Sequence, residues 1–298
     1  MSFAIATSLA DAIALMAEGA RPVAGGSDLV VGARHGKAPL PDAIVAIDRL
    51  DELAEITVEG PTLRIGALVT HATLMAHPLI GNDYSGVADA SALVGSPSTR
   101  NVGTIGGNVM NASPAMDTGA PLLVLGATVE LTSIRGIREI SLDALWTGPG
   151  RTSALRDELC TALILPTPPA RSGSAYVRLE YRRAMEIAVV GAAAMVHLDA
   201  NGTIASVAVA LTAVAPTIIM VDAVHALAGL SGPAAGIAIA EVASKQAAPI
   251  SDVRASDNYR RHCVGVMARR ALEAAVRRAS GESIAVPVNR ALGIGAAR

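Results

Sequence analysis

Apolar positions along the chain follow two periods, one typical of helices and one typical of strands. The clearest helical pattern covers residues 257–279, where Val264, Met267, Ala271 and Ala275 fall on one side and arginines occupy the others. We interpret it as a packing helix. Because helices and strands do not alternate regularly, the pattern predicts an α+β fold and not a doubly wound parallel sheet. Helices are predicted over residues 11–18, 29–36, 70–76, 87–93, 117–125, 221–228, 238–245 and 257–279, and strands over 22–24, 44–47, 54–59, 62–65, 127–132, 163–165 and 175–179.

One apolar stretch approaches the length of a membrane-spanning helix. Residues 203–221 run for nineteen positions without a charged side chain. They follow Asn201-Gly202, however, contain Pro216, and are preceded by another apolar run at residues 187–198. Asn-Gly between two apolar runs is a strong hairpin signal. The sequence therefore predicts a buried β-hairpin here and no transmembrane segment.

A proline-rich stretch divides the chain. Pro166, Pro168 and Pro169 lie within four residues, and no regular element tolerates such a run. At 298 residues the chain is long enough for two domains of ordinary size. We expect a first domain over residues 1–170 and a second over residues 171–298.

Composition narrows the class of protein. Hydrophobic residues make up 51% of the chain and aromatic residues only 2%, so Ala, Val, Leu and Ile must form the core. The 24 basic and 26 acidic residues nearly balance, and no basic block with interleaved aromatics is present, which argues against nucleic acid as a partner. The first twenty residues lack a basic segment and carry Asp11 and Glu18, so they predict an amphipathic helix and not a signal peptide. We expect a cytoplasmic protein.

The cysteines and histidines show no spacing typical of a metal site. Cys160 and Cys263 are the only cysteines and lie far apart, so they cannot form a four-thiolate zinc or iron–sulfur site alone. The six histidines show no ligand spacing such as HExxH. We interpret all of them as structural residues and expect no metal in this chain.

Two glycine-rich stretches remain, VAGGSDLVV at residues 23–31 and VGTIGGN at residues 102–108. Neither matches the dinucleotide-binding G-x-G-x-x-G or the P-loop pattern. Taken alone, each is a tight turn or a loop whose bare amides face a phosphate group. Two such loops in one domain could each supply N–H groups to half of a pyrophosphate, with Ser27, Thr104 and Asn108 adding side-chain hydrogen bonds.

Five motifs in a fixed order favour the phosphate-binding interpretation of the glycine-rich stretches, because they resemble those of a known family. They are AGGSDL at residues 24–29, RIGA at 64–67, TRNVGTIGGN at 99–108, ASPAMD at 112–117 and RRAMEIA at 182–188. Together the motifs resemble the FAD-binding medium subunit of the molybdenum hydroxylases, the xanthine dehydrogenase and aerobic carbon monoxide dehydrogenase family. The resemblance covers nearly the whole chain. The resemblance implies an FAD-binding domain of the vanillyl-alcohol oxidase type, with subdomains at about residues 1–58 and 59–170. A small domain with an antiparallel sheet and helices would follow.

The resemblance also implies where non-covalent FAD lies. Residues 25–29 would hold one side of its pyrophosphate and residues 104–108 the other, while Asp117 would accept hydrogen bonds from the polar part of the cofactor. The chain departs from the family at two positions: Arg178 stands where relatives often carry Lys near the isoalloxazine edge, and Glu186 where many have Asp. For Arg182, Arg183 and Glu186 the alternative is a surface charge cluster. Tyr176 and Tyr181 flank Arg178, so one of them could shield the ring. The predicted cofactor contacts are Ala24, Gly25, Gly26, Ser27, Asp28, Leu29, Val94, Gly95, Thr104, Ile105, Gly106, Gly107, Asn108, Ser113, Asp117, Cys160 and Arg178.

No catalytic acid or base stands out, and none is needed if the flavin only relays electrons. The resemblance implies a large molybdopterin-binding subunit and a small subunit with [2Fe–2S] clusters as partners, in a dimer of heterotrimers (a heterohexamer). Electrons would pass through the small subunit to this chain's FAD and on to an external acceptor. Two alternatives stay open: a stand-alone flavin oxidoreductase of the same fold, and a binding subunit that has lost its flavin.

Overall fold

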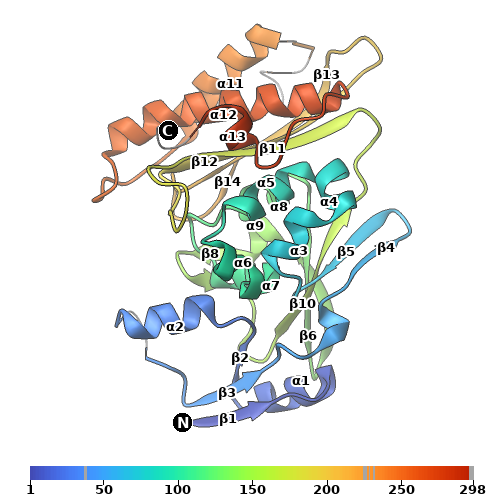
Figure 1. Cartoon of the computed structure of the whole chain (residues 1–298), viewed down its shortest axis with the longest axis vertical. Helices are drawn as coiled ribbons and strands as arrows, with labels where there is room; N and C mark the ends of the chain where they lie inside the picture. The colour runs from blue at the N-terminus through green and yellow to red at the C-terminus, as the bar shows by residue number, and fades with distance from the viewer. Residues whose placement is uncertain (37–38, 224–226, 228, 231, 295–298) are drawn as a thin grey trace.

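The computed structural model describes residues 1–36, 39–223, 227, 229–230 and 232–294. Three units follow one another along the long axis of the molecule (Figure 1). A small parallel sheet with two helices comes first, then a five-stranded sheet covered by short helices, then a four-stranded sheet under two longer helices. No helix of the described residues is long and apolar enough to cross a membrane.

The N-terminal unit is a three-stranded parallel sheet in the order β1-β3-β2. Helix α1 begins where the Ser8 side chain accepts a hydrogen bond from the Asp11 amide, and it buries Ala12, Ile13 and Met16. Ala12 and Met16 form part of a small separate core with Val45 and Leu53. The elements are β1 (Ser2–Ile5), α1 (Leu9–Ala17), β2 (Arg21–Val23), α2 (Ser27–Arg34), β3 (Ala43–Ala46) and the 3₁₀ helix η1 (Asp51–Leu53).

The central unit is an antiparallel sheet in the order β4-β5-β10-β6-β7, and short helices cover one of its faces. Its strands alternate, so that Leu63, Ile65, Val129, Leu131 and Leu163 face the main core under these helices. The elements are β4 (Ile56–Glu59), β5 (Thr62–Gly66), α3 (His71–Ala76), α4 (Pro78–Asp83), α5 (Ser85–Leu93), α6 (Pro97–Val102), α7 (Ile105–Asn111), α8 (Gly119–Val124), β6 (Thr128–Ser133), β7 (Gly136–Ser141), α9 (Leu142–Leu145), β8 (Trp146–Gly148), β9 (Arg151–Thr152) and β10 (Leu159–Pro166).

The C-terminal unit is an antiparallel sheet in the order β11-β12-β13-β14. Helix α12 packs on β11 and β12 and carries α11 on its other side, while α5 and α8 of the central unit contact the same sheet. The two predicted apolar runs pair as β12 and β13 across the Asn201-Gly202 turn, and α12 has the bounds predicted for it. The elements are β11 (Ser172–Leu179), β12 (Val190–Leu198), β13 (Ile204–Thr212), β14 (Ile219–Val221), α11 (Gly232–Gln246), α12 (Asp257–Ala279) and α13 (Val288–Ala291).

The structure corrects two local expectations. The glycine stretch at residues 102–108, predicted as a loop, lies largely in α6 and α7. Thr104 caps α7 through its hydroxyl. Gly106 lets the helix pack closely on Ala67, because a Cβ added to Gly106 would lie only 2.5 Å from the Cβ of Ala67. Of the predicted helix over 221–228, Val221 ends strand β14, and residues 224–226 and 228 lie outside the described residues.

Candidate functional site

The two glycine stretches meet each other in space. A Cβ added to Gly25 would lie 1.7 Å from the Val102 carbonyl oxygen, so no side chain fits there. An added Cβ on Gly103 would lie 3.6 Å from Ser27 Oγ. The tertiary structure therefore joins two segments that the sequence separates by more than seventy residues, and Gly25 is the residue that permits their close approach.

The start of α2 provides an anion-binding geometry. Gly26 takes the left-handed conformation with a φ of +67°, and no side chain caps the helix. The first intrahelical bond runs from the Val30 amide to the Gly26 carbonyl, and the N-cap residue has no side chain that could accept a hydrogen bond from the first turn. An uncapped helix N-terminus beside a glycine turn suits a phosphate group.

The second glycine segment offers fewer amides than the sequence predicts. The Ile105 amide donates to the Val69 carbonyl, and the Gly106 amide donates to the Ala67 carbonyl. These bonds hold α7 on the central sheet and occupy the two N–H groups. Gly107 is exposed, with its amide on Thr104 Oγ1 at 3.2 Å. The Thr118 hydroxyl donates to Asn108 Oδ1 at 2.6 Å, which leaves the Asn108 NH₂ as the group that can donate to a ligand.

A buried ionic network joins the central and C-terminal units. Arg178 Nη1 donates to Asp117 Oδ2 at 2.6 Å, and its Nε donates to Glu180 Oε2 at 2.9 Å. The Tyr176 hydroxyl donates to the other oxygen of Asp117 at 2.7 Å. The Arg178 side chain is fully buried, and those of Asp117 and Glu180 are nearly so. Both oxygens of Asp117 are thus held by groups of β11.

The charges of this network depend on one another. Burial raises the pKa of Asp117, and the charge of Arg178 and the Tyr176 hydrogen bond oppose that rise. Although burial alone lowers the pKa of Arg178, the charge of Asp117 raises it above its ordinary value. Burial, followed by the negative charge of Asp117, raises the pKa of Tyr176 well above its ordinary value. Tyr176 therefore stays a hydrogen-bond donor and Arg178 stays charged.

Arg178 is also fixed through its backbone. Its amide donates to Asn289 Oδ1 at 3.0 Å, and Asn289 Nδ2 donates to the Arg178 carbonyl at 2.9 Å. Asn289 therefore pairs with the free edge of β11 as a neighbouring strand would. Arg178 Nη2, in contrast, is buried without a hydrogen-bond partner. An orphaned guanidinium N–H beside a carboxylate fits a site that receives a further polar group.

The loop between β11 and β12 lies against the end of α5. The Glu186 carboxylate accepts hydrogen bonds from the amides of Tyr181, Arg182 and Ile187, which identifies it as a loop-ordering group and not only a surface charge. The Met185 amide donates to the Gly95 carbonyl at 2.9 Å. Arg178 Nη1 reaches the Glu186 carbonyl at 3.4 Å, so the predicted contacts Gly95 and Arg178 lie on neighbouring segments.

Other predicted contacts lie in varied surroundings. Cys160 is buried in the main core with its thiol directed to the Ala162 carbonyl, and burial, with the charge of Glu130, raises its pKa to about 12. Ser113 accepts a hydrogen bond from the Ala115 amide, before Asp117. Tyr176 is fully buried with its hydroxyl on Asp117 and so orients that carboxylate, while Tyr181 is half-exposed.

Sequence reasoning missed His71, Glu180 and Asn289. The His71 ring lies against Gly103, its Nδ1 is buried without a partner, and burial, with the charge of Arg100, lowers its pKa from 6.5 to about 4. Its position in the first turn of the helix predicted over residues 70–76 gave no local signal. Asn289 lies in a helix of four residues, too short for a periodic pattern. Glu180 follows Arg178 by two residues, which on a strand places both on one face, and this spacing was the available signal.

Comparison with known proteins identifies the family. Residues 1–168 match the family described as FAD binding domain in molybdopterin dehydrogenase. Residues 175–275 match the family described as CO dehydrogenase flavoprotein C-terminal domain. The two matches together cover most of the chain.

Individual relatives agree with these matches. The xanthine dehydrogenase FAD-binding subunit of Escherichia coli O157:H7 is 33% identical, over 94% of this chain and 98% of the relative. The carbon monoxide dehydrogenase medium chain of Afipia carboxidovorans is 36% identical, over 91% of this chain and 95% of the relative. A solved carbon monoxide dehydrogenase from Hydrogenophaga pseudoflava contains a chain that superposes with a TM-score of 0.88 at 30% identity, covering 93% of this chain and 98% of that one. The chain therefore belongs to the family of FAD-binding subunits of molybdenum hydroxylases, as an oxidoreductase subunit with an FAD-binding domain and a CO dehydrogenase-type C-terminal domain.

Proposed function

We propose that this chain is the electron-transfer subunit of a molybdenum hydroxylase complex. It would take electrons from an iron–sulfur subunit and pass them through non-covalent FAD to an external acceptor. The observation that carries this proposal is the approach of Gly25 to Val102, which brings the uncapped start of α2 beside the second glycine segment. Two glycine segments in contact at a helix N-terminus suit a pyrophosphate.

Different segments of the chain would bind different parts of FAD. The start of α2, with Ser27, and the segment of Thr104 and Asn108 would hold the pyrophosphate. Asp117 would accept hydrogen bonds from the polar part of the cofactor, in an orientation set by Tyr176 and Arg178. When bound, FAD supplies the ability to take up and release electrons, and the protein supplies binding and electrostatics. The Arg178 guanidinium, paired with Asp117 and Glu180, would place a fixed hydrogen-bond donor beside the cofactor.

The proposal assigns the other redox centres to partner subunits. Cys160 and Cys263 lie in different cores, and no group of three or more metal-ligating side chains occurs among the described residues. We propose a large molybdopterin-binding subunit, a small [2Fe–2S] subunit and assembly as a dimer of heterotrimers. Names of relatives support this, since two of them are medium chains of carbon monoxide dehydrogenases. The cytoplasmic location and the domain boundary near residue 170 stay predictions.

The test is to purify the full chain alone and together with co-expressed large and small partner subunits. We expect flavin absorbance bands near ~375 and ~450 nm, and about one FAD released per chain on denaturation. Reduced iron–sulfur partner should then reduce this flavin, while the chain alone should turn over no substrate. Turnover by the chain alone would favour the stand-alone oxidoreductase. A colourless complex would overturn the proposal.

A further inference from the structure

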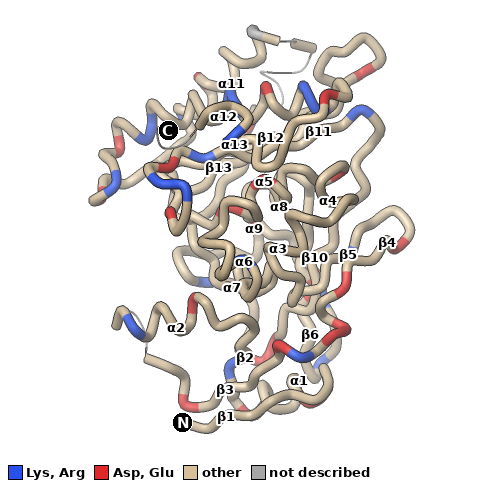
Figure 2. Tube along the Cα trace, in the orientation of Figure 1, with Lys and Arg blue, Asp and Glu red and all other residues tan. Residues whose placement is uncertain are grey.

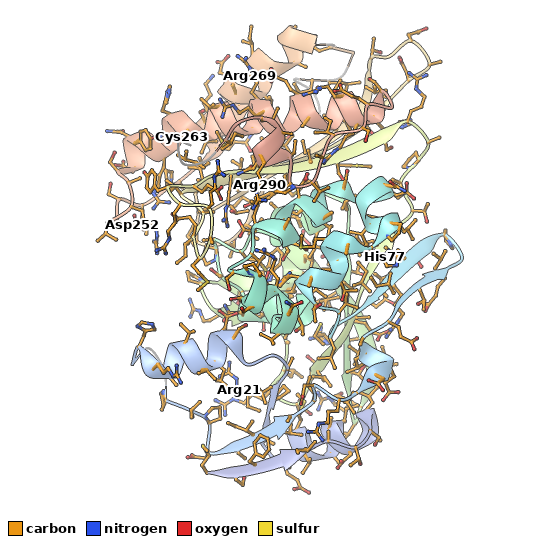
Figure 3. The ribbon with its side chains drawn as sticks, in the orientation of Figure 1. Arg21, His77, Asp252, Cys263, Arg269 and Arg290 are labelled. Carbon is orange, nitrogen blue, oxygen red and sulfur yellow. The ribbon has the colours of Figure 1, made fainter. Side chains whose placement is uncertain are left out.

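The short helix α13 brings Asn289 and Arg290 to the predicted flavin site. Asn289 pairs with the backbone of Arg178, and the Val288 amide donates to Asp89 Oδ1 at 2.9 Å, so α13 is held by both β11 and α5. Arg290, which follows Asn289, is exposed. Figure 3 shows Arg290 on the side of α13 toward the short helices of the central unit, whereas Arg269 lies away from it at α12.

A second arginine reaches the same region from the central unit. Arg100, on α6, donates from Nη1 to the Val94 carbonyl at 2.9 Å. The neighbouring Gly95 carbonyl accepts the Met185 amide, and the carbonyl after Met185 accepts Arg178 Nη1. These contacts place the guanidinium groups of Arg100 and Arg178 beside the same pair of short segments, residues 94–95 and 185–186.

The charges of these arginines act on one another. Besides burial, the positive charges of Arg290 and Arg178 lower the pKa of Arg100, as expected for groups within electrostatic range. Arg178 is neutralised by Asp117 and Glu180. Within the described part of the chain, neither Arg100 nor Arg290 has a carboxylate partner within ion-pair distance. Figure 2 shows further Lys and Arg gathered along α12 and on the β11–β12 loop.

We propose that Arg100 and Arg290 form an anion-binding subsite at the Val94–Gly95 edge of the flavin site, which receives a small electron acceptor carrying phosphate or carboxylate groups. The inference rests on the proposed function and adds the charge class of the acceptor. Two observations point to a ligand there: the uncompensated charges themselves, and the buried Arg178 Nη2 that has no partner. Because Arg178 is fully buried and Arg100 is half-buried, a small anion reaches this cluster more readily than a broad protein surface does.

The experiment compares two one-electron acceptors of opposite charge. The FAD-loaded chain is reduced and mixed in a stopped-flow instrument with ferricyanide, a trianion, or with a cationic ferrocenium. Two ions of either acceptor remove the two electrons of one reduced FAD, and its protons pass to solvent. The variants are Arg290→Gln and Arg100→Gln, with Arg100→Lys retaining the charge. The matched control is Arg269→Gln, which removes an exposed arginine paired with Glu273.

At low ionic strength we expect each Gln variant to slow ferricyanide reduction about threefold to tenfold, with the ferrocenium rate unchanged or raised. Arg100→Lys and Arg269→Gln should keep the wild-type rates. Inorganic pyrophosphate should bind the oxidised, FAD-loaded protein in calorimetry, and each Gln variant should weaken that binding by a similar factor.

Ferricyanide rates and pyrophosphate binding that both stay unchanged in the Gln variants would overturn the inference. Equal slowing of both acceptors would also overturn it, since the arginines would then act on the flavin itself. FAD content is measured first for every variant. A wild-type chain that never carries FAD contradicts the proposed function, whereas a yellow chain without a charge preference contradicts only this subsite.

Discussion

Arg178 Nη1 lies 2.6 Å from Asp117 Oδ2, and this ion pair joins two elements from different units of the chain. Asp117 precedes α8 of the central unit, while Arg178 lies on β11 of the C-terminal sheet. Since Tyr176 lies on β11 as well and Glu180 follows the end of this strand, the C-terminal unit determines how the Asp117 carboxylate is oriented. A domain that contributes no glycine segment thus shapes the predicted cofactor site.

Removing the carboxylate should therefore be costly to stability. Asp117→Ala removes one charge-assisted hydrogen bond of the buried Arg178 and leaves Glu180 as its one remaining carboxylate partner, so we expect a loss of about 1.5–3 kcal/mol in the free energy of unfolding. FAD content should fall with it. Urea unfolding and FAD quantification test this. Tyr176→Phe removes one neutral donor and should lose only about 1 kcal/mol, so equal effects of the two substitutions would contradict a charge-based role.

The contact between the glycine segments predicts a steric effect. Gly25→Ala would place a Cβ 1.7 Å from the Val102 carbonyl oxygen, so the segments must separate and the purified protein should carry little FAD. Gly32→Ala is the matched control, because Gly32 lies inside α2 with nothing within 4 Å of an added Cβ. That change should keep the cofactor and stabilise the helix by up to about 1 kcal/mol. Full FAD occupancy in Gly25→Ala would show that the contact is dispensable.

His71 predicts a pH dependence of stability. Burial, with Arg100, lowers its pKa from 6.5 to about 4 in the folded chain, so the unfolded chain binds the proton more tightly. Its contribution is present above pH 6.5 and is lost as the pH falls toward 4, by up to about 3 kcal/mol. Urea midpoints at pH 7 and pH 5 measure it. His71→Gln should reduce the difference between these midpoints, and the exposed His35→Gln should not.

Asn289 predicts a role for the C-terminal helix. Asn289→Ala removes both hydrogen bonds between the Asn289 side chain and the Arg178 backbone, so the buried backbone amide of Arg178 loses its partner. We expect about 1–3 kcal/mol of destabilisation and weaker FAD retention on gel filtration. The exposed turn residue Asn201→Ala serves as the control for loss of an asparagine. Wild-type FAD retention in a destabilised Asn289→Ala chain would limit Asn289 to a structural role.

Local sequence determined much of this protein. The apolar period of residues 257–279 predicts α12, and Asn201-Gly202 predicts the β12–β13 turn, because both depend on neighbours in the sequence. The ordered glycine motifs indicated the family, which the comparisons confirm. Local pattern failed at residues 102–108, where packing of Gly106 on Ala67 and the Thr104 cap favour helix over loop.

Only the tertiary structure decided which residues share a site. Asp117 and Arg178 are 61 positions apart, and Arg178 and Asn289 are 111 apart. Their pairing depends on how the C-terminal sheet packs against α5 and α8, which no local period encodes. Helix α13, with four residues, has no stability of its own and forms where Asp89 and β11 hold it. The sequence by itself thus determined the elements and the family, and packing decided the site.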